Sequence, residues 1–470
     1  MAYGVPDYLH LTKRLGIVGA SQLPFHYLLT WKSSWSPVQI LTRASHETLN
    51  VYHQLLGRVV TWLVVIHTAL YLNFYVQNNL LGSKLKEFYV LCGLAGVVAL
   101  TAIGTTALEP LRKRNYRVFY VVHVVLATAL VPVLFFHVHH IRIYLYETAA
   151  VYVVNSLVRW LSATDLRGSI RSIPNTSLVE IIVSTDSSTA ANRLAQNLRP
   201  GQHAYVSVTG NSFVHNFRSN PFTVASIPDT DGYIKFVARA LNGNTKLLLS
   251  NAEKDSSDTK VNITVEGSYG LTYEDKLLQY DRVLFVAGGV GATFVVPLYR
   301  QLLVDLSPGK GSYRRQKVSF VWIARTKSEV TWAVPTSLRE KESFAERLKI
   351  CLTGVNTEGN GNAMDYDDNV EAGAIDEHED GIELEEQKQL LSGIAQSDRN
   401  SAAEADDLAV YTGRPDLRRL VHQTLSHGGN ERVAIVVCGP KALGRDIRHE
   451  IAPWVKRGRD VWFHNESFSL

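Results

Sequence analysis

Apolar residues fill the first third of the chain in runs long enough to cross a bilayer. Three runs stand out for their length and low charge, at residues 49–76, 88–108 and 116–140. Each approaches or exceeds the roughly 20 residues that a membrane helix needs. Weaker runs at 15–31 and 143–161 indicate two further spans. The pattern therefore predicts an α-helical membrane bundle of five spans.

From about residue 170 the pattern changes to short β-branched runs separated by turn residues, such as SLVEIIVST, HAYVSVTG and YIKFVARA. Alternation of this length and spacing predicts an antiparallel β-barrel. After Asp281 buried strands alternate with helical sequence, which predicts a parallel, doubly wound α/β sheet. We therefore expect a transmembrane domain at 1–165, a barrel at 166–275 and an α/β domain at 276–470.

An acidic segment interrupts the last domain at about residues 356–408. It carries many Asp and Glu residues and few apolar ones, so it cannot bury enough surface to offset the entropy lost on ordering. We expect a disordered insertion here. An acidic metal-binding loop is the alternative.

Four histidines occupy matched positions in two of the predicted membrane helices. His53 and His67 are fourteen residues apart in the second span, and His123 and His137 have the same spacing in the fourth. Fourteen helical residues make about 3.9 turns, so both imidazoles of one helix lie near the same face. A lone histidine in an apolar helix is more often a hydrogen-bonded core residue than a ligand. Four at matched depths in a membrane, where ionisable groups are costly, favour a functional role.

The order of the spans predicts how these histidines pair. Because one span separates the two helices, they should run parallel and pair His53 with His123 and His67 with His137. Each pair can hold a haem from both faces, with one histidine from each helix. The basic loop EPLRKRNYR marks the cytoplasmic side by the positive-inside rule. The first pair is therefore expected on the inner side.

Composition and charge narrow the class of protein. The net charge of +4 is small for 470 residues, which gives no case for nucleic-acid binding. The three cysteines Cys92, Cys351 and Cys438 are far apart and form no CxxC. This argues against both a disulfide framework and a thiolate metal site. The opening residues also lack the pattern of a secretory signal.

A glycine-rich turn in the predicted α/β domain is a candidate phosphate site. In VAGGVGATF, Gly288, Gly289 and Gly291 follow a strand and Thr293 stands near the start of the next helix. Backbone N–H groups and a helix N-terminus in this position can face a pyrophosphate. We expect these four residues to contact a nucleotide.

Two further strand ends in the α/β domain are candidates for nucleotide contact. The triplet CGP, formed by Cys438, Gly439 and Pro440, ends a buried strand, where ligands gather in open parallel sheets. Cys438 would there be a small residue that allows close approach to a nicotinamide. Arg325 closes the strand VSFVWIAR, where its guanidinium can bind a ribose 2′-phosphate. The sequence therefore predicts a preference for NADPH over NADH.

Together these features resemble the fungal ferric reductase transmembrane components, which are kin to NADPH oxidases. The resemblance covers nearly the whole chain and includes the C-terminal FHNESF and a box, NPFT, at Asn220, Pro221, Phe222 and Thr223. In the family this box reads HPFT and lies against the flavin, so Asn220 is a departure. The family also usually has six spans, so we expect that an N-terminal span and any outer domain are missing here.

The resemblance implies further cofactor contacts. Thr223 would hydrogen-bond the isoalloxazine, while Arg239 and the turn from Gly243 to Thr245 match positions that meet the FAD phosphates. In relatives a C-terminal aromatic stacks on the flavin and moves aside for the nicotinamide, and Phe468 matches that position. Thr223 and Phe468 are thus the residues expected at the reacting centre. The two soluble domains would form a ferredoxin reductase-like module.

The function that the resemblance implies is an electron relay. Cytosolic NADPH would supply electrons through FAD and two haems b to Fe³⁺ or Cu²⁺ chelates outside the cytoplasm. The protein would be multi-pass in the lipid of the plasma membrane, with cytoplasmic nucleotide domains, and could serve a high-affinity iron permease. Two alternatives stay open: a superoxide-generating NADPH oxidase built from the same parts, and a non-enzymatic membrane haem protein.

Overall fold

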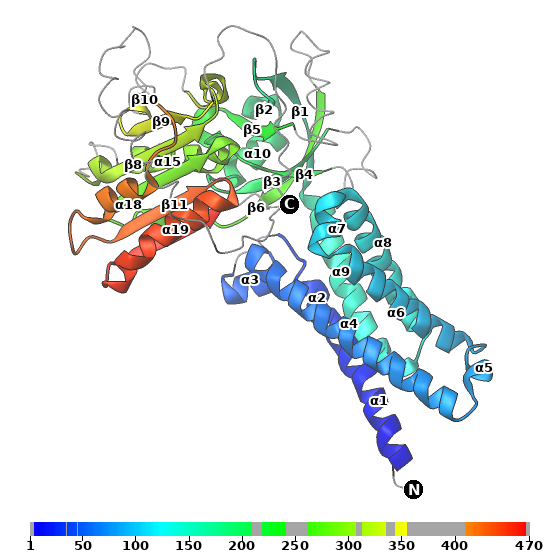
Figure 1. Ribbon diagram of the computed structural model, residues 1–470. Coiled ribbons are helices and arrows are strands. Elements are labelled where there is room, and N and C mark those ends of the chain that lie inside the picture. Colours follow the sequence, from blue (N-terminus) through cyan, green and yellow to red (C-terminus); the bar gives the residue numbers. More distant parts are fainter. Residues whose placement is uncertain are drawn as a thin grey trace.

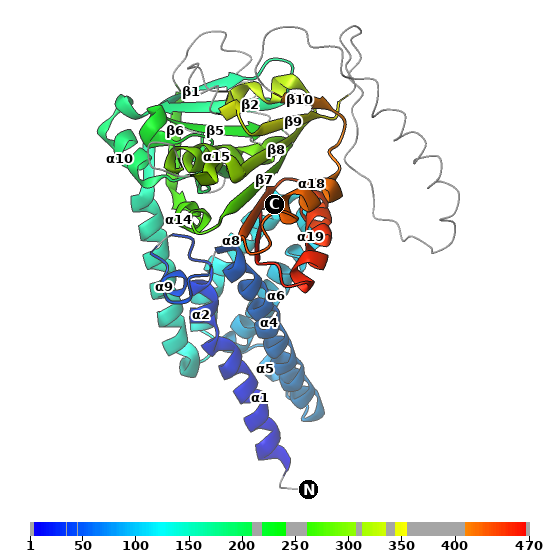
Figure 2. The same ribbon diagram turned by 90° about the vertical axis from the view of Figure 1, so that its left-hand side faces the viewer.

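A computed structural model describes residues 4–33, 35–44, 46–208, 219–240, 261–306, 313–334, 344–354 and 409–466 of the protein. Figures 1 and 2 show a bundle of long helices projecting from two adjoining β domains, with the N-terminus at the far end of the bundle. The predicted order of helical bundle, antiparallel barrel and doubly wound sheet is confirmed. The acidic segment at 356–408 lies outside the described residues.

The bundle begins near the N-terminus and ends where the first strand starts. Its helices are α1 (Gly4–Ser21), α2 (Leu23–Leu28), α3 (Pro37–Thr42), α4 (His46–Gln77), α5 (Leu81–Lys84), α6 (Phe88–Thr106), α7 (Glu109–Arg114), α8 (Tyr116–Phe135), the 3₁₀ turn η1 (His139–Ile141) and α9 (Arg142–Ser162).

Among the described residues three helices are long and apolar enough to cross a membrane, namely α4 over Thr48–Gln77, α6 and α8. The predicted first span at 15–31 corresponds to the end of α1 and to α2, which a turn at Gln22 separates, and neither helix is among these three. α9 covers the predicted fifth span but carries charged side chains such as Glu147.

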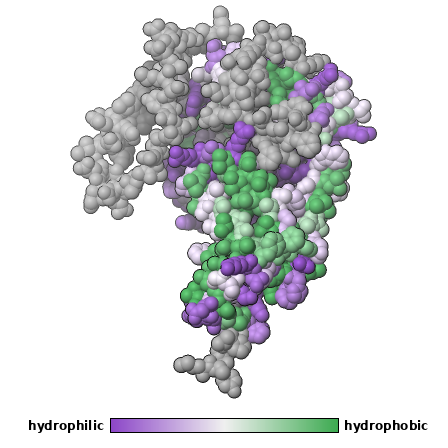
Figure 3. Space-filling view, turned by 90° about the vertical axis from the view of Figure 1, so that its right-hand side faces the viewer, coloured by the Kyte–Doolittle hydropathy of each residue, from purple (hydrophilic) through white to green (hydrophobic). Residues whose placement is uncertain are grey.

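The outer surface of the bundle is strongly apolar. Trp62 on α4 is 66% exposed and Val98 on α6 is 61% exposed, and many other large apolar side chains of the bundle are also exposed. Figure 3 shows a hydrophobic surface over these helices and polar residues toward the end of the bundle away from the β domains. So much exposed apolar surface would be unfavourable in water and suits contact with lipid. The chain is therefore a membrane protein.

The helices pack closely where small residues meet large ones. α6 packs along α8, and α1 packs along α4. A Cβ on Gly96 of α6 would lie 2.7 Å from Cδ2 of Leu134 on α8, well inside contact distance. Glycine at this position allows the two backbones to approach, as is common between membrane helices.

The barrel follows α9 without a linker, because β1 starts at the residue after α9 ends (Figure 2). Its sheet is antiparallel in the order β4-β3-β6-β1-β2-β5, and a bridge between Val224 and Phe236 joins its two edges. The side chains of Ile181, Phe236 and Val265 are fully buried inside. The elements are β1 (Ala163–Ser172), β2 (Leu178–Ser184), η2 (Thr185–Ser187), α10 (Thr189–Asn197), β3 (His203–Ser207), β4 (Asn220–Thr223), α12 (Pro228–Asp231), β5 (Tyr233–Arg239) and β6 (Val261–Tyr269).

The α/β domain contains a parallel sheet in the order β10-β9-β8-β7-β11-β12. The chain enters at β7, proceeds outward through β8, β9 and β10, and returns to β11, so the strand order reverses between β7 and β11. Ligands bind outside the carboxyl ends of parallel strands at such a switch point. The elements are α14 (Glu274–Leu277), β7 (Arg282–Gly288), η3 (Gly289–Gly291), α15 (Ala292–Asp305), η5 (Tyr313–Lys317), β8 (Val318–Ala324), η6 (Lys327–Glu329), η7 (Thr331–Ala333), β9 (Leu348–Leu352), β10 (Ala409–Thr412), α18 (Leu417–Leu425), β11 (Val433–Cys438), α19 (Lys441–Lys456) and β12 (Val461–Glu466).

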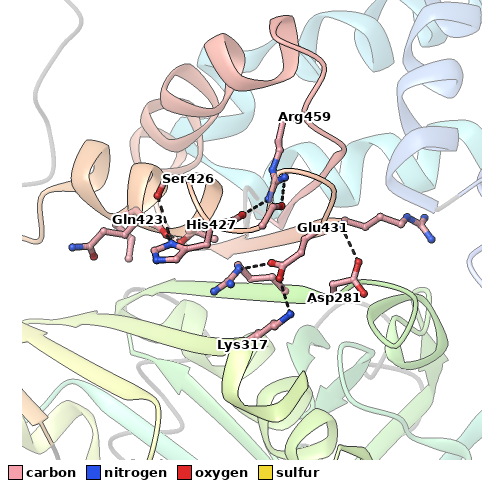
Figure 4. A network of polar contacts seen from close by, with 12 residues as sticks. Asp281, Lys317, Gln423, Ser426, His427, Glu431 and Arg459 are labelled. Carbon is pink, nitrogen blue, oxygen red and sulfur yellow. Dashed lines mark hydrogen bonds and ion pairs between the residues drawn. The ribbon is translucent and has the colours of Figure 1, made fainter. Parts of the chain in front are cut away.

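A polar network ties together the opposite edge of this sheet, where the strands begin (Figure 4). Glu431 accepts hydrogen bonds from Lys317 at 2.6 Å and from Arg282 at 3.0 Å, linking the loop before β11 to the starts of β8 and β7. These contacts hold the pKa of the Glu431 carboxyl below its usual range, and the hydrogen bond from Lys317 has the largest effect. Arg459, two residues before β12, donates to the carbonyls of His427 and Gly428. The network fixes strand positions and lies away from the nucleotide edge.

Candidate functional site

The structure brings the four membrane histidines together in two pairs, each with one ring from α4 and one from α8. The ring centroids of His53 and His123 are 6.2 Å apart, and those of His67 and His137 are 6.5 Å apart. A metal about 2 Å from one nitrogen of each ring would place the centroids roughly 6.3 Å apart. Both pairs thus have the separation that two axial ligands of one iron require.

Backbone carbonyls orient both rings of the pair far from the β domains. Nδ1 of His67 lies 2.7 Å from the carbonyl oxygen of Thr12 on α1, and Nδ1 of His137 lies 2.7 Å from that of Tyr89 on α6. A carbonyl can only accept, so Nδ1 carries the proton in each ring. This leaves the lone pair on Nε2, the nitrogen that would bind a metal.

Glycine makes these two contacts possible. Gly16 stands four residues after Thr12, and Gly93 stands four residues after Tyr89. A Cβ on Gly16 would lie 2.8 Å from Cε1 of His67, and a Cβ on Gly93 would lie 2.6 Å from Nδ1 of His137. Each imidazole ring therefore packs directly against a glycine of the neighbouring helix, where a side chain would leave no room for it. Sequence reasoning missed both glycines, although their four-residue offset from the accepting carbonyls is the same.

The pair nearer the β domains is held differently. Nδ1 of His53 donates to the carbonyl of His26 at 3.2 Å, and Nε2 of His26 donates back to the carbonyl of His53 at 3.1 Å. The two rings stack with centroids 4.1 Å apart. Within the part of the chain that the structure describes, Nδ1 of His123 is buried without a hydrogen-bond partner. His26 thus orients His53 without belonging to a pair itself.

The four histidines form two-ligand sites only. Among the described residues no three His, Cys, Asp or Glu side chains gather in a group that could hold a metal ion. Two imidazoles at axial spacing in an apolar bundle match a haem, whose porphyrin supplies the other four ligands. The donor set and its spacing therefore fit two haems.

At the switch point the glycine turn after β7 meets the CGP turn after β11, backbone against backbone. A Cβ on Gly291 would lie 2.6 Å from the carbonyl carbon of Cys438, and one on Gly439 would lie 3.0 Å from Cα of Gly288. A Cβ on Gly288 would lie 2.8 Å from Cδ of Pro440. Larger residues would separate the turns, so the glycines allow a flat edge that a dinucleotide can approach.

Two predicted contact residues are buried within this edge. The Thr293 hydroxyl donates to the carbonyl of Val290 at 2.9 Å, so it stabilises the start of α15. The Cys438 side chain is completely buried. Burial, together with the nearby Glu466 carboxylate, raises the pKa of its thiol well above the ordinary value. This shift favours the neutral thiol, which is less nucleophilic than the thiolate.

The NPFT box forms β4 at one edge of the barrel sheet. In its register with β3, Thr223 lies opposite His203 and Pro221 lies opposite Tyr205. Phe222 packs against the barrel core. Because side chains alternate along a strand, Pro221 and Thr223 point to the opposite face from Phe222, where Pro221 is exposed and Thr223 is buried. Asn220, the departure from the family box, is on the same side of the strand as Phe222.

Arg239 joins the barrel to the α/β domain beside the glycine turn. Its Nη2 donates to Oε1 of Glu329 at 2.9 Å, and a Cβ on Gly289 would lie 3.5 Å from the same nitrogen. Glu329 also accepts from the backbone N–H of Arg325 at 3.0 Å. The Arg325 side chain is exposed at the carboxyl edge of the sheet. The remaining predicted residues, Gly243, Thr245 and Phe468, lie outside the described residues.

Comparison with known families agrees with each part of this arrangement. Residues 15–134 match the family model of a ferric reductase like transmembrane component, residues 171–273 that of an FAD-binding domain, and residues 280–452 that of a ferric reductase NAD binding domain. A membrane bundle joined to a flavin barrel and a nicotinamide-binding sheet defines a membrane-bound flavoprotein oxidoreductase. With these three domains in this order, the chain belongs to the ferric reductase family.

Curated fungal relatives are similar along most of the chain. A probable metalloreductase of Meyerozyma guilliermondii is 22% identical over 93% of this chain and 80% of its own length. Ferric reductase transmembrane component 3 of Saccharomyces cerevisiae is 23% identical over 94% of this chain and 59% of its own. Ferric reductase transmembrane component 1 of Schizosaccharomyces pombe is 23% identical over 96% of this chain and 78% of its own length. The chain thus spans about three fifths of the Saccharomyces relative.

Proposed function

We propose that this protein is a transmembrane ferric or cupric chelate reductase. It would take electrons from cytosolic NADPH and deliver them, by way of FAD and two haems b, to a metal chelate on the other side of the membrane. The observation that carries the proposal is the presence of two histidine pairs at axial spacing, one near the β domains and one near the opposite end of the bundle.

The residues of the bundle would hold one haem at each depth. His53 and His123 would bind the inner haem, and His67 and His137 the outer one. Haem iron changes by one electron at a time, whereas a nicotinamide delivers two as hydride and FAD mediates between them. Because two imidazoles would ligate each iron, neither haem would have a position open for a substrate. A metal chelate would therefore be reduced at the outer surface of the bundle.

The soluble domains would hold the other two cofactors. The face of β4 that bears Pro221 and Thr223 would carry the isoalloxazine, and Arg239 would meet the FAD phosphates. The turns at Gly289 and Gly439 would bind NADPH across the switch point, with Arg325 on the 2′-phosphate. Phe468 would cover the flavin between turnovers.

The choice of acceptor follows the relatives. Those compared are named as ferric reductases, ferric/cupric reductases or metalloreductases, which favours Fe³⁺ or Cu²⁺ over oxygen. We place the protein in the plasma membrane, in contact with lipid, with the nucleotide domains in the cytoplasm. A relative from Aspergillus oryzae is named as a probable cell surface ferric reductase. Reduced iron could then pass to a high-affinity permease.

The test uses membranes that contain the full chain. NADPH-dependent reduction of a ferric chelate is measured with and without superoxide dismutase, for the wild type and for His137→Ala. His140→Ala is the matched control, because His140 is an exposed histidine at the same turn. We expect dismutase-insensitive reduction that disappears only in His137→Ala. Loss of reduction on adding dismutase would identify a superoxide-generating oxidase instead, and no NADPH-dependent reduction of either acceptor would indicate a non-enzymatic haem protein.

A further inference from the structure

A buried ion pair connects the membrane bundle to the barrel. Arg159, in the last turn of α9, donates from Nε to Oε1 of Glu266 at 2.7 Å and from Nη2 to Oε2 at 3.0 Å. Glu266, on β6, is only 1% exposed, and the Tyr269 hydroxyl donates to it at 2.7 Å. A bidentate pair with a further hydrogen bond is the arrangement in which a buried charge is tolerated.

A second contact reaches the same part of the barrel from another segment of the bundle. Lys32, between α2 and α3, donates from Nζ to the hydroxyl of Tyr205 at 2.5 Å and lies 4.2 Å from the centroid of that ring. Burial, together with the nearby Arg159 charge, lowers the pKa of Lys32 to about 8. Tyr205 and Glu266 are partners in the register of β3 with β6. Two bundle segments thus converge on adjacent barrel residues.

Arg159 and Lys32 contact the face of the barrel that carries Pro221 of the NPFT box. Tyr205 lies opposite Pro221 in the register of β3 with β4, and directly opposed residues of antiparallel strands point to the same side. Pro221, Tyr205 and Glu266 therefore form one row across three strands. Any change in the Arg159 or Lys32 contact would move the face on which the isoalloxazine is expected.

The bundle side of this junction leads to the inner histidine pair. At the start of α8, the ring centroids of Tyr116 and Phe119 are 5.6 Å apart, and those of Phe119 and His123 are 5.4 Å apart. Aromatic rings thus extend from the start of α8 to His123.

We infer that the Arg159–Glu266 pair and the Lys32–Tyr205 contact form a joint that sets the position of the flavin-binding face relative to the inner histidine pair. Arg159 is in this account a positioning residue for electron transfer between flavin and inner haem. The inference rests on the proposed function. Neither contact is apparent from the sequence, because the partners are 107 and 173 residues apart.

The test separates the two halves of the electron path in the full-length holoprotein. Anaerobic stopped-flow mixing with NADPH follows flavin bleaching and haem reduction at their own wavelengths. For Arg159→Met we expect unchanged flavin reduction and haem reduction slowed several-fold, because electron transfer slows as the flavin and the inner haem move apart. The charge-swapped protein, Arg159→Glu with Glu266→Arg, should recover part of the rate. Arg199→Met is the control, because Arg199 forms an exposed pair with Asp229 on the same barrel.

A second measurement does not depend on bound cofactors. Hydrogen exchange of the connection at residues 29–36, which holds Lys32, should be faster in Arg159→Met and in the milder variant Tyr205→Phe than in the wild type. Wild-type exchange in both variants, or wild-type haem reduction in Arg159→Met, would overturn the joint. If the wild type itself binds no haem, the proposed function fails, and the exchange comparison still decides whether the joint exists.

Discussion

Gly93 of α6, which contacts the His137 ring, allows a prediction of how much haem binding a small substitution would cost. Gly93→Ala would place a methyl group 2.6 Å from Nδ1 of His137, whereas ordinary contact begins at 3.4 Å. Restoring ordinary contact requires the ring or a helix backbone to shift by at least about 0.8 Å.

A shift of this size disturbs both nitrogens of the ring. The hydrogen bond from Nδ1 of His137 to the carbonyl of Tyr89 is 2.7 Å long and would stretch beyond the useful range. Nε2 would leave the position, about 2 Å from iron, that an axial ligand occupies. Overpacking typically costs about 1–3 kcal/mol, which corresponds to roughly 5- to 140-fold weaker retention of the outer haem.

The assay is the haem content of purified protein, read from reduced-minus-oxidised spectra per polypeptide. Gly93→Ala should lose the outer haem and keep the inner one. Gly104→Ala is the matched control in the same helix, because nothing lies within 4 Å of a Cβ at that position. Full haem content and an unchanged spectrum in Gly93→Ala would refute the packing of His137 on Gly93.

Three other predictions follow from the sites described above. His53→Ala should remove the inner haem and His67→Ala the outer one, which the same difference spectra would reveal; unchanged content in both would rule out the ligand assignment. Arg325→Ala should lower kcat/KM for NADPH by about tenfold or more through loss of a charge-assisted contact, with little change for NADH; an unaltered ratio would remove Arg325 from the 2′-phosphate site. Glu431 is stabilised as the carboxylate, so its contribution is present above the ordinary pKa of 4.5 and is lost as the pH falls below it. Glu431→Gln should therefore lower the melting temperature at pH 7 and lower it by less at pH 3, and an equal difference at both would contradict the ion-pair account.

Local patterns in the sequence were sufficient to predict the framework of the site. The fourteen-residue spacing of His53 and His67 fixes their common face through helix geometry alone. Short alternating runs and buried strands likewise predicted a barrel followed by a doubly wound sheet. These features depend on a few neighbouring residues, so they survive without knowledge of tertiary packing.

The partners of the site residues could not be predicted in this way. Which carbonyl accepts from His67 depends on how α1 packs against α4, and Thr12 is 55 residues away. Arg239 was assigned to FAD phosphates by resemblance, yet the structure also pairs it with Glu329, 90 residues later and in another domain. Such contacts arise from tertiary packing, which periodicity does not encode.

The stoichiometry and ligation of haem in the purified full chain test the central claim most directly. Haem extracted per polypeptide, together with the low-temperature electron paramagnetic resonance spectrum of the oxidised protein, counts the haems and identifies their axial ligands. The account predicts two haems b per chain, both low-spin with two histidine ligands, as the paired rings of α4 and α8 require. One haem or none, or a high-spin signal from an open axial site, would contradict it.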